Sequence, residues 1–506
     1  MAYTLKFKDI VMTSAFRRIT PSGRCPLILD VGGPAPDLSG YDAKYSWVPQ
    51  AEFLRELYPQ GHKILDPKIY KNDFIQVKED LPDGTSVKHW VEREVARIAV
   101  PFQYVIKTQQ VIHLTGNDIV LVNSDAAPKQ REKDWLVTYK QLWRNRNMNM
   151  AFFNAVDSEK CTGNAAVAFY FTKPGGKPKI NVKVYSYLDG YTICDTIYSD
   201  TDGEPEIQAI KYQSYDAETM KTVQWVDVWD RKRAYRYRNN GTEAPSNPDD
   251  IYVGKDDGYT LVSVREHGYD GRVPVKVKRS RIGACWTPVQ HLCDDYDVQA
   301  SNLCQAARVL PHAVFFVKGG EGQVETAADG RPTAIVTPDT QADAKFLTPT
   351  DTSGASDTAL KLLEDKIFLG SFIVKPPEVK SGDLPGIAIK LIYAPSLDKA
   401  IADAKEWDPF VDGIVDMFSY GAAVEMGDSS LAEIGITGFA EPYIHQNTAE
   451  VIQNLVNSKQ GGILSSETGT AKNPYSESDE YSRVQAELKA QQEAEERQLQ
   501  NTINKK

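Results

Sequence analysis

The stretch TPVQHLCDDYDVQASNLCQAARVLP, residues 287–311, decides how this chain is organised. Apolar or small residues recur in it at intervals of three and four, which is the spacing of one face of an α-helix. They are Val289, Leu292, Cys293, Tyr296, Ala300, Leu303, Ala307 and Leu310. Thr287 is a suitable N-cap, Pro288 fits the first turn, and Pro311 cannot continue the helix. The pattern therefore predicts a helix over residues 288–310.

A second helical pattern covers residues 356–374, and two prolines follow it. Its apolar face carries Leu360, Leu363, Ile367 and Phe368. At about 1.5 Å per residue, the two helices are roughly 34 and 28 Å long. The sequence between them predicts strands at Ala313–Lys318 and Pro332–Val336, separated by glycine-rich turns. Two long helices with a small β-rich tip bury little apolar surface within one chain, so we expect neighbouring copies to cover it.

The composition is that of an ordinary soluble protein, with 41% hydrophobic and 25% charged residues among 506. No apolar run approaches the roughly 20 residues that cross a bilayer, and residues 1–6 do not open a signal peptide. We therefore expect assembly in a cytoplasm and no membrane partner. The six cysteines form no C-x-x-C pair, which favours free buried thiols over disulfides or a zinc site.

The formal net charge of −11 argues against a protein that grips nucleic acid over its whole surface, because phosphate neutralisation needs clustered Lys and Arg. The charge is compatible with a conduit for DNA, since an acidic wall repels phosphates and limits sticking. Two basic clusters are expected to be solvated edges or subunit contacts rather than DNA sites. One comprises Lys276, Lys278, Arg279 and Arg281, and the other Arg231, Lys232, Arg233, Arg236 and Arg238.

The first half of the chain predicts helices packed on an antiparallel β region. Residues 1–60 indicate an extended arm with a short helix near Ala51–Leu57. A period of 3.6 residues over Asp134–Asp157 predicts one long helix, and a weaker helical pattern covers Val91–Ile106. From Ala165 to about Val264 the pattern is that of strands, which favours an α+β fold over a doubly wound α/β fold.

The strand region opens with a predicted hairpin. Apolar residues in Ala166–Phe171 and Ile180–Val184 flank the turn Pro174-Gly175-Gly176, where the glycines can adopt positive φ. Further strands are expected at Tyr191–Tyr198, Ile207–Gln213, Val223–Trp229 and Ala234–Tyr237.

The segment after the second long helix, residues 376–395, is predicted to be a loop because it is polar and contains glycine and proline. Ser396 is then expected to cap another long helix, which Pro409 should bend. The tail from about Ser476 is rich in Glu, Gln, Ala and Lys, and it is either a surface helix or a frayed end.

No motif for nucleotide binding or hydrolysis is present in the sequence. Gly176-Lys177 and Gly254-Lys255 lack the Ser or Thr of a Walker A loop, and no H-E-x-x-H, G-x-S-x-G or G-x-G-x-x-G occurs. The calcium-loop fragment Asp200–Gly203 lacks carboxylates at the first and last ligand positions, so a β-turn is expected there. Ser396-Leu397-Asp398-Lys399 fits S-x-x-K without its companion motifs. We therefore expect no enzyme activity, cofactor or metal site.

Four stretches of the chain form an ordered set. The first is the strand-rich run from Tyr185 to Asp230, and the second leads from Gly271-Arg272-Val273-Pro274 into the D-x-Y-D-x-x-x-S pattern of Asp294–Ser301. The third is the order helix, strands, helix, loop, helix. The fourth is Gly461–Thr468, which is similar to a G-I-x-S-x-E-T signature. In this order they resemble the portal, or head-to-tail connector, proteins of tailed bacteriophages, over about residues 90–490.

The resemblance implies an α+β, portal-like and ring-forming fold. Its parts would be a β-rich wing at 1–287, a two-helix stem at 288–310 and 353–375, a small α/β clip at 311–352, a channel loop at 376–395, a long kinked helix with the wing return at 396–460, and a helical crown and tail at 461–506. The stem would pack through Leu292, Tyr296, Leu303, Leu310, Leu360, Leu363 and Ile367. The residues expected to face DNA are Lys375, Lys380, Ser381, Gly382, Asp383 and Lys390.

The same resemblance implies a homo-oligomeric ring of about twelve copies at one capsid vertex of a virion, assembled in the host bacterial cytoplasm. Such a ring would conduct double-stranded DNA in packaging and ejection. It would dock the terminase large subunit, a head-completion or adaptor protein, and the major capsid or scaffold protein. We also expect the clip strands to pair between neighbouring copies, because a strand pair of this size is marginal alone.

Two other interpretations remain open at this point. The 25 tyrosines and eight tryptophans are compatible with a carbohydrate- or protein-binding β module, because aromatic residues serve binding surfaces as well as cores. A hydrolase with a site assembled from distant residues is the second. The mass of the purified protein separates a ring from both, and a search for clustered carboxylates in a pocket tests the hydrolase.

Overall fold

The computed structural model describes most of the chain and divides it into two compact units. The described residues are Met12 and 16–21, 43–80, 86–216, 220–239, 259–309, 314–318, 323–326, 332–336, 343–347, 353–375, 386–443, 448–476 and 480–503. The first unit is Met1–Ile373 with Lys399–Pro442, and the second is Val374–Asp398 with Tyr443–Lys506. All strand pairs in the described residues are antiparallel, and helices occupy separate stretches, so the α+β expectation is confirmed.

Short strands and one helix form the N-terminal part of the first unit. Strands β1 (Phe16–Pro21) and β2 (Ala43–Val48) pair with each other, and the predicted short helix is α2, Gln50–Leu57. Strands β3 (Asp73–Asp80) and β4 (Ser86–Arg93) form a second hairpin. The helical pattern expected over residues 91–106 is wrong at its start: β4 ends there, and α3 (Phe102–Thr115) begins only after Pro101.

The long helix expected over Asp134–Asp157 is in fact two helices. They are α4 (Gln130–Asn145) and α5 (Met148–Thr162), and Asn147 between them has φ 52°. Asparagine tolerates this left-handed conformation better than most residues, so it allows a sharp change of direction without breaking the apolar period.

The central sheet has the strand order β14-β6-β7. Strands β6 (Asn164–Thr172) and β7 (Lys179–Tyr185) confirm the predicted hairpin, and Gly175 and Gly176 have φ of 62° and 84° in its turn. The third strand, β14 (Val275–Arg279), was not predicted as a strand, because its alternating lysines were interpreted as a basic cluster.

A second sheet has the order β13-β12-β11-β10-β8, and β9 also pairs with β10. Its members are β8 (Thr192–Ile193), β9 (Ile197–Tyr198), β10 (Pro205–Asp216), β11 (Lys221–Trp229), β12 (Arg233–Asn239) and β13 (Tyr259–Glu266). Three of the four predicted strands are confirmed as β10, β11 and β12. The fourth, expected over Tyr191–Tyr198, comprises the two short strands β8 and β9.

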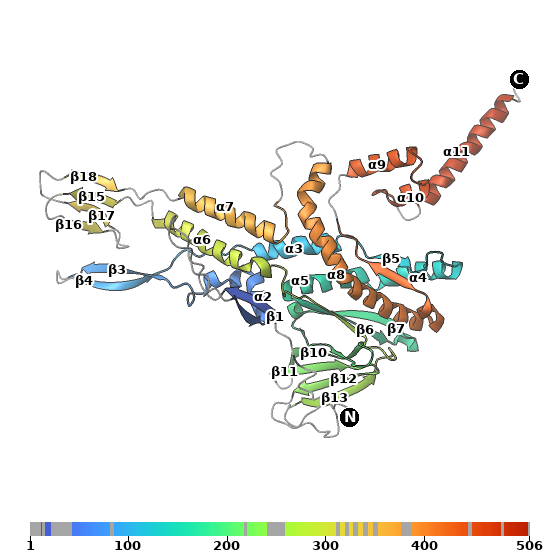
Figure 1. Ribbon diagram of the computed structural model, residues 1–506, viewed down its shortest axis with the longest axis horizontal. Coiled ribbons are helices and arrows are strands. Elements are labelled where there is room, and N and C mark those ends of the chain that lie inside the picture. The colour runs from blue at the N-terminus through green and yellow to red at the C-terminus, as the bar shows by residue number, and fades with distance from the viewer. Residues whose placement is uncertain are drawn as a thin grey trace, which may run out of the picture. The chain divides into compact units, whose positions relative to one another are not determined.

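Strand β6 is buried on both faces. Val167 and Phe169 belong to one apolar cluster with helices α4, α5 and α8, whereas Ala166 and Ala168 belong to another with residues of the second sheet. Alternate side chains of a strand point to opposite faces, so β6 joins the helical layer to the second sheet. Figure 1 shows α5 and α8 on one side of β6 and β7, and β10–β13 on the other.

The predicted helix pair is present. Helix α6 (Gln290–Val309) follows a 3-10 turn at Thr287–Val289, and α7 (Ser353–Gly370) packs against it. Between them, β15 (Val314–Lys318) pairs with β18 (Asp343–Leu347), and β16 (Gln323–Thr326) pairs with β17 (Pro332–Val336). The expectation of two strands is confirmed for β15 and β17. Pairing of these strands between copies stays a prediction.

The loop expected over residues 376–395 is wrong from Gly386 onward, because helix α8 covers Gly386–Met426. Ser396 therefore lies inside this helix instead of capping it, and the helix also contains Pro395. Apolar residues that were assigned to the loop continue the helical stretch. The bend at Pro409 stays a prediction.

The remaining elements include one strand pair and three helices. Strand β19 (Ile436–Phe439) pairs with β5 (Val120–Asn123). In the second unit, α9 is Thr448–Gln460, α10 is Ser466–Ala471, and α11 is Glu480–Ile503, so the C-terminal tail is helical. Ser465 caps α10, because its hydroxyl accepts from the backbone N–H of Thr468 at 3.1 Å. None of the helices in the described residues is both long enough and apolar enough to cross a membrane.

Candidate functional site

Trp286, just before the 3-10 turn that leads into α6, anchors the start of this helix. This side chain is fully buried, and its indole N–H donates to the Glu56 carboxylate at 2.9 Å. The 3-10 turn that contains Pro288 then leads directly into α6. A buried tryptophan whose N–H is satisfied fixes both position and direction, so the start of α6 is held in place within the first unit.

A ladder of hydrogen bonds holds residues 96–100 along α6. The backbone N–H groups of Ala96, Ile98 and Val100 donate to side chains of the helix at 2.9, 2.8 and 2.9 Å. The acceptors are Gln305, Ser301 and Asp297, respectively. Acceptors four residues apart lie on one helical face, and alternate residues of an extended segment present N–H groups to the same side. The second Asp and the Ser of the D-x-Y-D-x-x-x-S pattern, Asp297 and Ser301, thus bind backbone N–H groups of residues 96–100.

Asp297 also binds His62, and both side chains are buried. The His62 Nδ1 lies 2.6 Å from Asp297 Oδ2, and its Nε2 lies 2.9 Å from the carbonyl oxygen of Glu56. Beside it, Lys63 donates to Asp294 at 2.9 Å. Acidic residues of α6 therefore tie together the ladder segment and the region after α2.

Aromatic contacts join α6 to α7 and α3. Phe102 packs edge-on against Tyr296 and Phe368, with ring centroids 4.8 and 6.2 Å away. Ile367 is fully buried in the same cluster, whereas Leu292 and Tyr296 are half-buried against it. Of the other residues predicted to pack the stem, Leu303, Leu360 and Leu363 are half-buried, and Leu310 lies outside the described residues.

A second apolar stripe on α7 faces solvent. Leu362, Leu369 and the following Phe372 have 57%, 65% and 48% of their surface exposed. Leu362 and Leu369 are seven residues apart, which puts them on one side of the helix, away from Ile367, and Phe372 follows two residues after the helix ends. This stripe was not predicted, because the apolar residues of α7 were all assigned to a single face. The leucine spacing alone could have revealed it.

The end of α7 is a closed turn around Phe372, which has φ 58°. The N–H of Ile373 donates to the carbonyl oxygen of Phe368 at 3.1 Å, and that of Phe372 to Leu369 at 3.3 Å. This is the bonding of a left-handed helix cap, a position where glycine is usual. Phenylalanine takes this conformation at a cost in free energy. Its large apolar side chain stands at the exposed end of the stripe.

Ion pairs fix α8 to α5 close to this turn. Lys160 of α5 donates to Asp403 of α8 at 2.8 Å, and Lys399 binds the other oxygen of Asp403 at 2.5 Å. Burial lowers the pKa of Lys160, but attraction to Glu159 and Asp403 outweighs this, and the pKa lies above its ordinary value. Burial raises the pKa of Glu159, whose Oε2 has no hydrogen-bond partner. The lysine is therefore held charged between two helices.

The residues predicted to face DNA are only partly within the described chain. Lys375 is exposed five residues beyond α7, and Lys390 belongs to α8 instead of to a loop. The remaining predicted channel residues, Lys380, Ser381, Gly382 and Asp383, lie outside the described residues.

Several residues of the two basic clusters are neutralised within the chain. Arg236 binds both oxygens of Asp227 at 2.8 and 2.9 Å, and Arg279 binds Asp195 at 2.9 Å. Arg231 donates to Asp202 at 2.7 Å and holds the pKa of that carboxyl well below its usual range. The segment that resembles a calcium loop is thus a turn tied to Arg231. These pairs leave less positive charge for phosphates than the sequence suggests.

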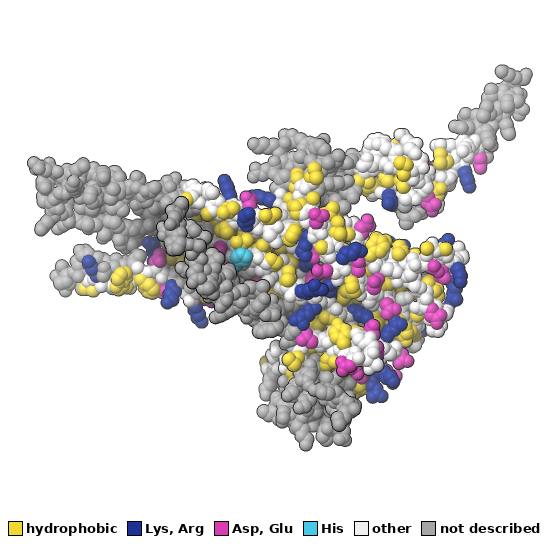
Figure 2. Space-filling view, viewed as in Figure 1, with side chains coloured by type: hydrophobic (Ala, Val, Ile, Leu, Met, Phe, Trp, Pro, Cys, Tyr) yellow, Lys and Arg dark blue, Asp and Glu magenta, His cyan; other side chains and the backbone are white. Residues whose placement is uncertain are grey.

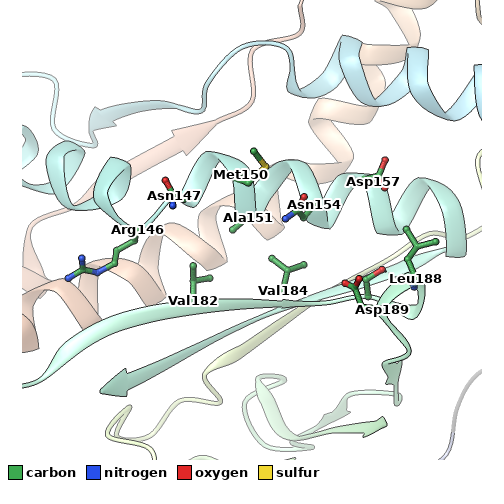
Figure 3. Close-up of a pocket in the computed structure, with 11 residues that line it drawn as sticks. Arg146, Asn147, Met150, Ala151, Asn154, Asp157, Val182, Val184, Leu188 and Asp189 are labelled. Carbon is green, nitrogen blue, oxygen red and sulfur yellow. Dashed lines mark hydrogen bonds between the residues drawn. The ribbon is translucent and has the colours of Figure 1, made fainter. Parts of the chain in front are cut away.

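A groove of about 470 Å³ lies between α5 and β7 (Figure 3). Arg146 stands at one end and Asp189 at the other, with Val182 and Val184 on the strand side. Arg146 binds Glu425 at 2.6 and 2.9 Å, and Asp157 binds Lys107 at 2.8 Å. Two of the three charged residues that line the groove, Arg146 and Asp157, are thus engaged in ion pairs within the fold, and the third is Asp189.

Among the described residues, the cysteines do not indicate a reactive thiol, and the potential metal ligands do not indicate a metal site. Cys161, Cys194, Cys285 and Cys293 are buried and unpaired, as expected. Burial raises the pKa of Cys194 and Cys285 to about 12, so these thiols are protonated and unreactive. In the part of the chain that the structure describes, no group of three His, Cys, Asp or Glu side chains is placed to hold a metal ion.

Comparison with protein families identifies the class to which this arrangement belongs. A model of phage portal proteins matches residues 43–498, which is most of the chain. The chain therefore belongs to the SPP1 Gp6-like family of phage portal proteins. It is a virion component of the head-to-tail connector, structural in role and not an enzyme. No curated protein sequence matches the chain.

Solved structures similar to this chain were also found. One is from "Virion of native gene transfer agent (GTA) particle", with 13% identity and a TM-score of 0.34 over 72% of this chain and 87% of that chain. Another is from "Neck of empty GTA particle computed with C6 symmetry", with 13% identity and a TM-score of 0.35 over 72% of this chain and 88% of that chain.

Proposed function

We propose that this portal protein forms a closed ring of about twelve copies at one capsid vertex, and that double-stranded DNA passes through the ring during packaging and ejection. In this proposal residues 1–287 are the wing, α6 and α7 the stem, residues 311–352 the clip, and residues 461–506 the crown. The ring docks the terminase large subunit, head-completion or adaptor proteins, and the capsid or scaffold protein.

The exposed stripe of α7 is the observation that carries the ring. Leu362, Leu369 and Phe372 remain open to solvent after α6 and α7 have packed together. The exposed positions of α6, in contrast, carry no large apolar side chain: they are His291, Asp295, Gln299, Asn302, Ala307 and Arg308. Two different outer faces suit a head-to-tail contact in which one copy's α7 meets another surface of the next copy, and such contacts close into rings.

The charge of the chain supports a conduit more than a binder of DNA. The net charge is −11, and arginines of both basic clusters already bind carboxylates of the same chain. A duplex that must slide needs weak contacts, because each neutralised phosphate adds to affinity. We assign the contacts that do occur to Lys375, Lys380 and Lys390, and to the neighbouring Ser381, Gly382 and Asp383.

The test replaces leucines of the stripe by arginine. Leu362→Arg and Leu369→Arg should abolish rings, since a charge placed in an apolar contact must be desolvated without a partner. Val137→Arg, at a 58% exposed position of α4, is the matched control. Native mass spectrometry and negatively stained electron micrographs report the assembly. Wild-type protein that stays monomeric or dimeric at all concentrations would contradict the ring.

A further inference from the structure

The β3–β4 hairpin exposes large apolar side chains. Trp90 has 66% of its surface exposed, Phe74 60%, Val87 49% and Val91 38%. Figure 2 shows hydrophobic side chains gathered at the surface of this arm. A single exposed apolar residue is ordinary, but a tryptophan and a phenylalanine together on one small element usually mark a contact surface.

The strand register places these side chains on both faces of the hairpin. Trp90 pairs with Gln76, two positions from the pair of Phe74 with Glu92, so Trp90 and Phe74 share one face. Val91 pairs with Ile75, and Val87 pairs with Glu79, so the two valines share the other face. A hairpin that is apolar on both sides must be covered on both sides to be fully stabilised.

The hairpin is fixed at its base and projects from there. Arg97 donates to the carbonyl oxygen of Tyr70 at 2.9 Å and to Asn72 Oδ1 at 2.5 Å, and Asn72 donates to Glu92 at 2.9 Å. Arg97 belongs to the segment that is bound along α6. None of the four buried apolar clusters in the described chain includes a residue of β3 or β4. An isolated two-stranded hairpin is only marginally stable in water, so the hydrogen bonds at its base do not by themselves explain the stability of the β3–β4 hairpin.

A second copy of the chain is the occupant that the arrangement favours. The hairpin and the α7 stripe are separate apolar surfaces, and α6 runs between α7 and the hairpin in Figure 1. Asp297 of α6 accepts from Val100 of the ladder segment, and Phe368 of α7 packs in the apolar cluster that includes Tyr296 of α6. Surfaces on different sides of one chain cannot both be covered by a single isologous contact, but a head-to-tail ring covers both on every copy.

We propose that the β3–β4 hairpin is an arm that docks on the adjacent copy, with Trp90 as its anchor and Phe74 beside it. This inference rests on the proposed ring and adds to it a contact outside the stem helices. Tryptophan is the residue whose truncation most often weakens a protein interface strongly, because its large surface is desolvated there.

The first experiment truncates the arm in the full chain. Trp90→Ala with Phe74→Ala should raise the protein concentration at half-assembly at least about tenfold, as for other interface hot spots. Tyr198→Ala, at a 59% exposed aromatic position on β9, is the matched control and should leave it unchanged. Since the arm is exposed in the single chain, the thermal unfolding of dilute, unassembled protein should be the same for all three proteins.

The second experiment locates the contact. A photo-crosslinking phenylalanine analogue placed at residue 90 should join adjacent copies into a covalent ladder on denaturing gels, and the same analogue at residue 198 should give no ladder. Normal assembly of the truncated arm, or rings with crosslinks only inside single chains, would overturn the arm and leave the ring intact. Wild-type protein that never assembles would overturn the ring itself and the arm with it.

Discussion

His267 is held as a neutral imidazole by its neighbours. Its Nδ1 accepts from the backbone N–H of Tyr269 at 3.0 Å, and its Nε2 lies 3.0 Å from the carbonyl oxygen of Asp230, to which it donates. Both nitrogens are therefore satisfied without a second proton. Burial lowers the pKa of His267 below its ordinary value, and the Asp230 carbonyl and carboxylate offset only part of this. Protonation would remove the acceptor for Tyr269.

This arrangement predicts how stability changes with pH. The unfolded chain takes up a proton at His267 at a higher pH than the folded chain does, so the stability from this residue is complete above about pH 6.5 and falls as pH is lowered. His267→Gln, which keeps a donor for Asp230 but does not titrate, should make urea unfolding less dependent on pH between 7.5 and 5.5. Equal pH dependence in both proteins would show that His267 has the same pKa folded and unfolded.

At the scale of elements, the ladder between residues 96–100 and α6 explains why an irregular segment is well placed. The segment forms no sheet, yet three of its N–H groups have acceptors on one face of a helix. Buried backbone donors need such partners, since an unsatisfied donor costs more than the bond gains. The ladder also carries the base of the β3–β4 hairpin, because Arg97 lies within it.

Removal of one hydrogen bond of the ladder tests whether it stabilises the fold. Ser301→Ala leaves the N–H of Ile98 without its acceptor and should lower the free energy of unfolding by about 1–3 kcal/mol. Asn302→Ala, at the next and exposed position of α6, should change it by less than about 0.5 kcal/mol. Chemical denaturation of both variants measures the difference. If both variants cost equally little, the 2.8 Å contact has no energetic role.

Elements with a strong period were predictable from sequence, and those that depend on tertiary contacts were not. The apolar spacing in α6 and the glycines between β6 and β7 act locally, so both predictions are confirmed. The break at Asn147 does not interrupt the apolar period, and β4 ends just before a helical pattern begins. The start of α8 was missed because Gly386 and Pro395 are usually loop residues.

The candidate site could be predicted only in part for a similar reason. Spacing identified Ile367 and Tyr296 as packing residues, and they lie in the cluster between α6, α7 and α3. No sequence pattern indicates that Asp297 and Ser301 bind backbone atoms about 200 positions away in the chain. The spacing of Leu362 and Leu369 did indicate a second side of α7, but the prediction assigned all apolar residues of this helix to one face.

At the scale of the whole molecule, the stability of the folded chain should be coupled to the assembly of copies. The α7 stripe and the β3–β4 hairpin are exposed in the single chain, so each added contact between copies removes apolar surface from water. Anything that binds only the folded state stabilises it by mass action, and here the bound partner is another copy of the chain. A head-to-tail ring gives every copy two such contacts.

The melting temperature of the wild-type protein should therefore rise with protein concentration across the range in which rings form. Each tenfold increase above the dissociation constant adds about 1.4 kcal/mol for a single contact. Leu369→Arg, which should not assemble, should melt at one temperature at every concentration and below the assembled wild type. Calorimetry combined with mass photometry on the same samples measures both quantities. Rings that melt at the temperature of the single chain would mean that contacts between copies stabilise neither the helix pair nor the hairpin.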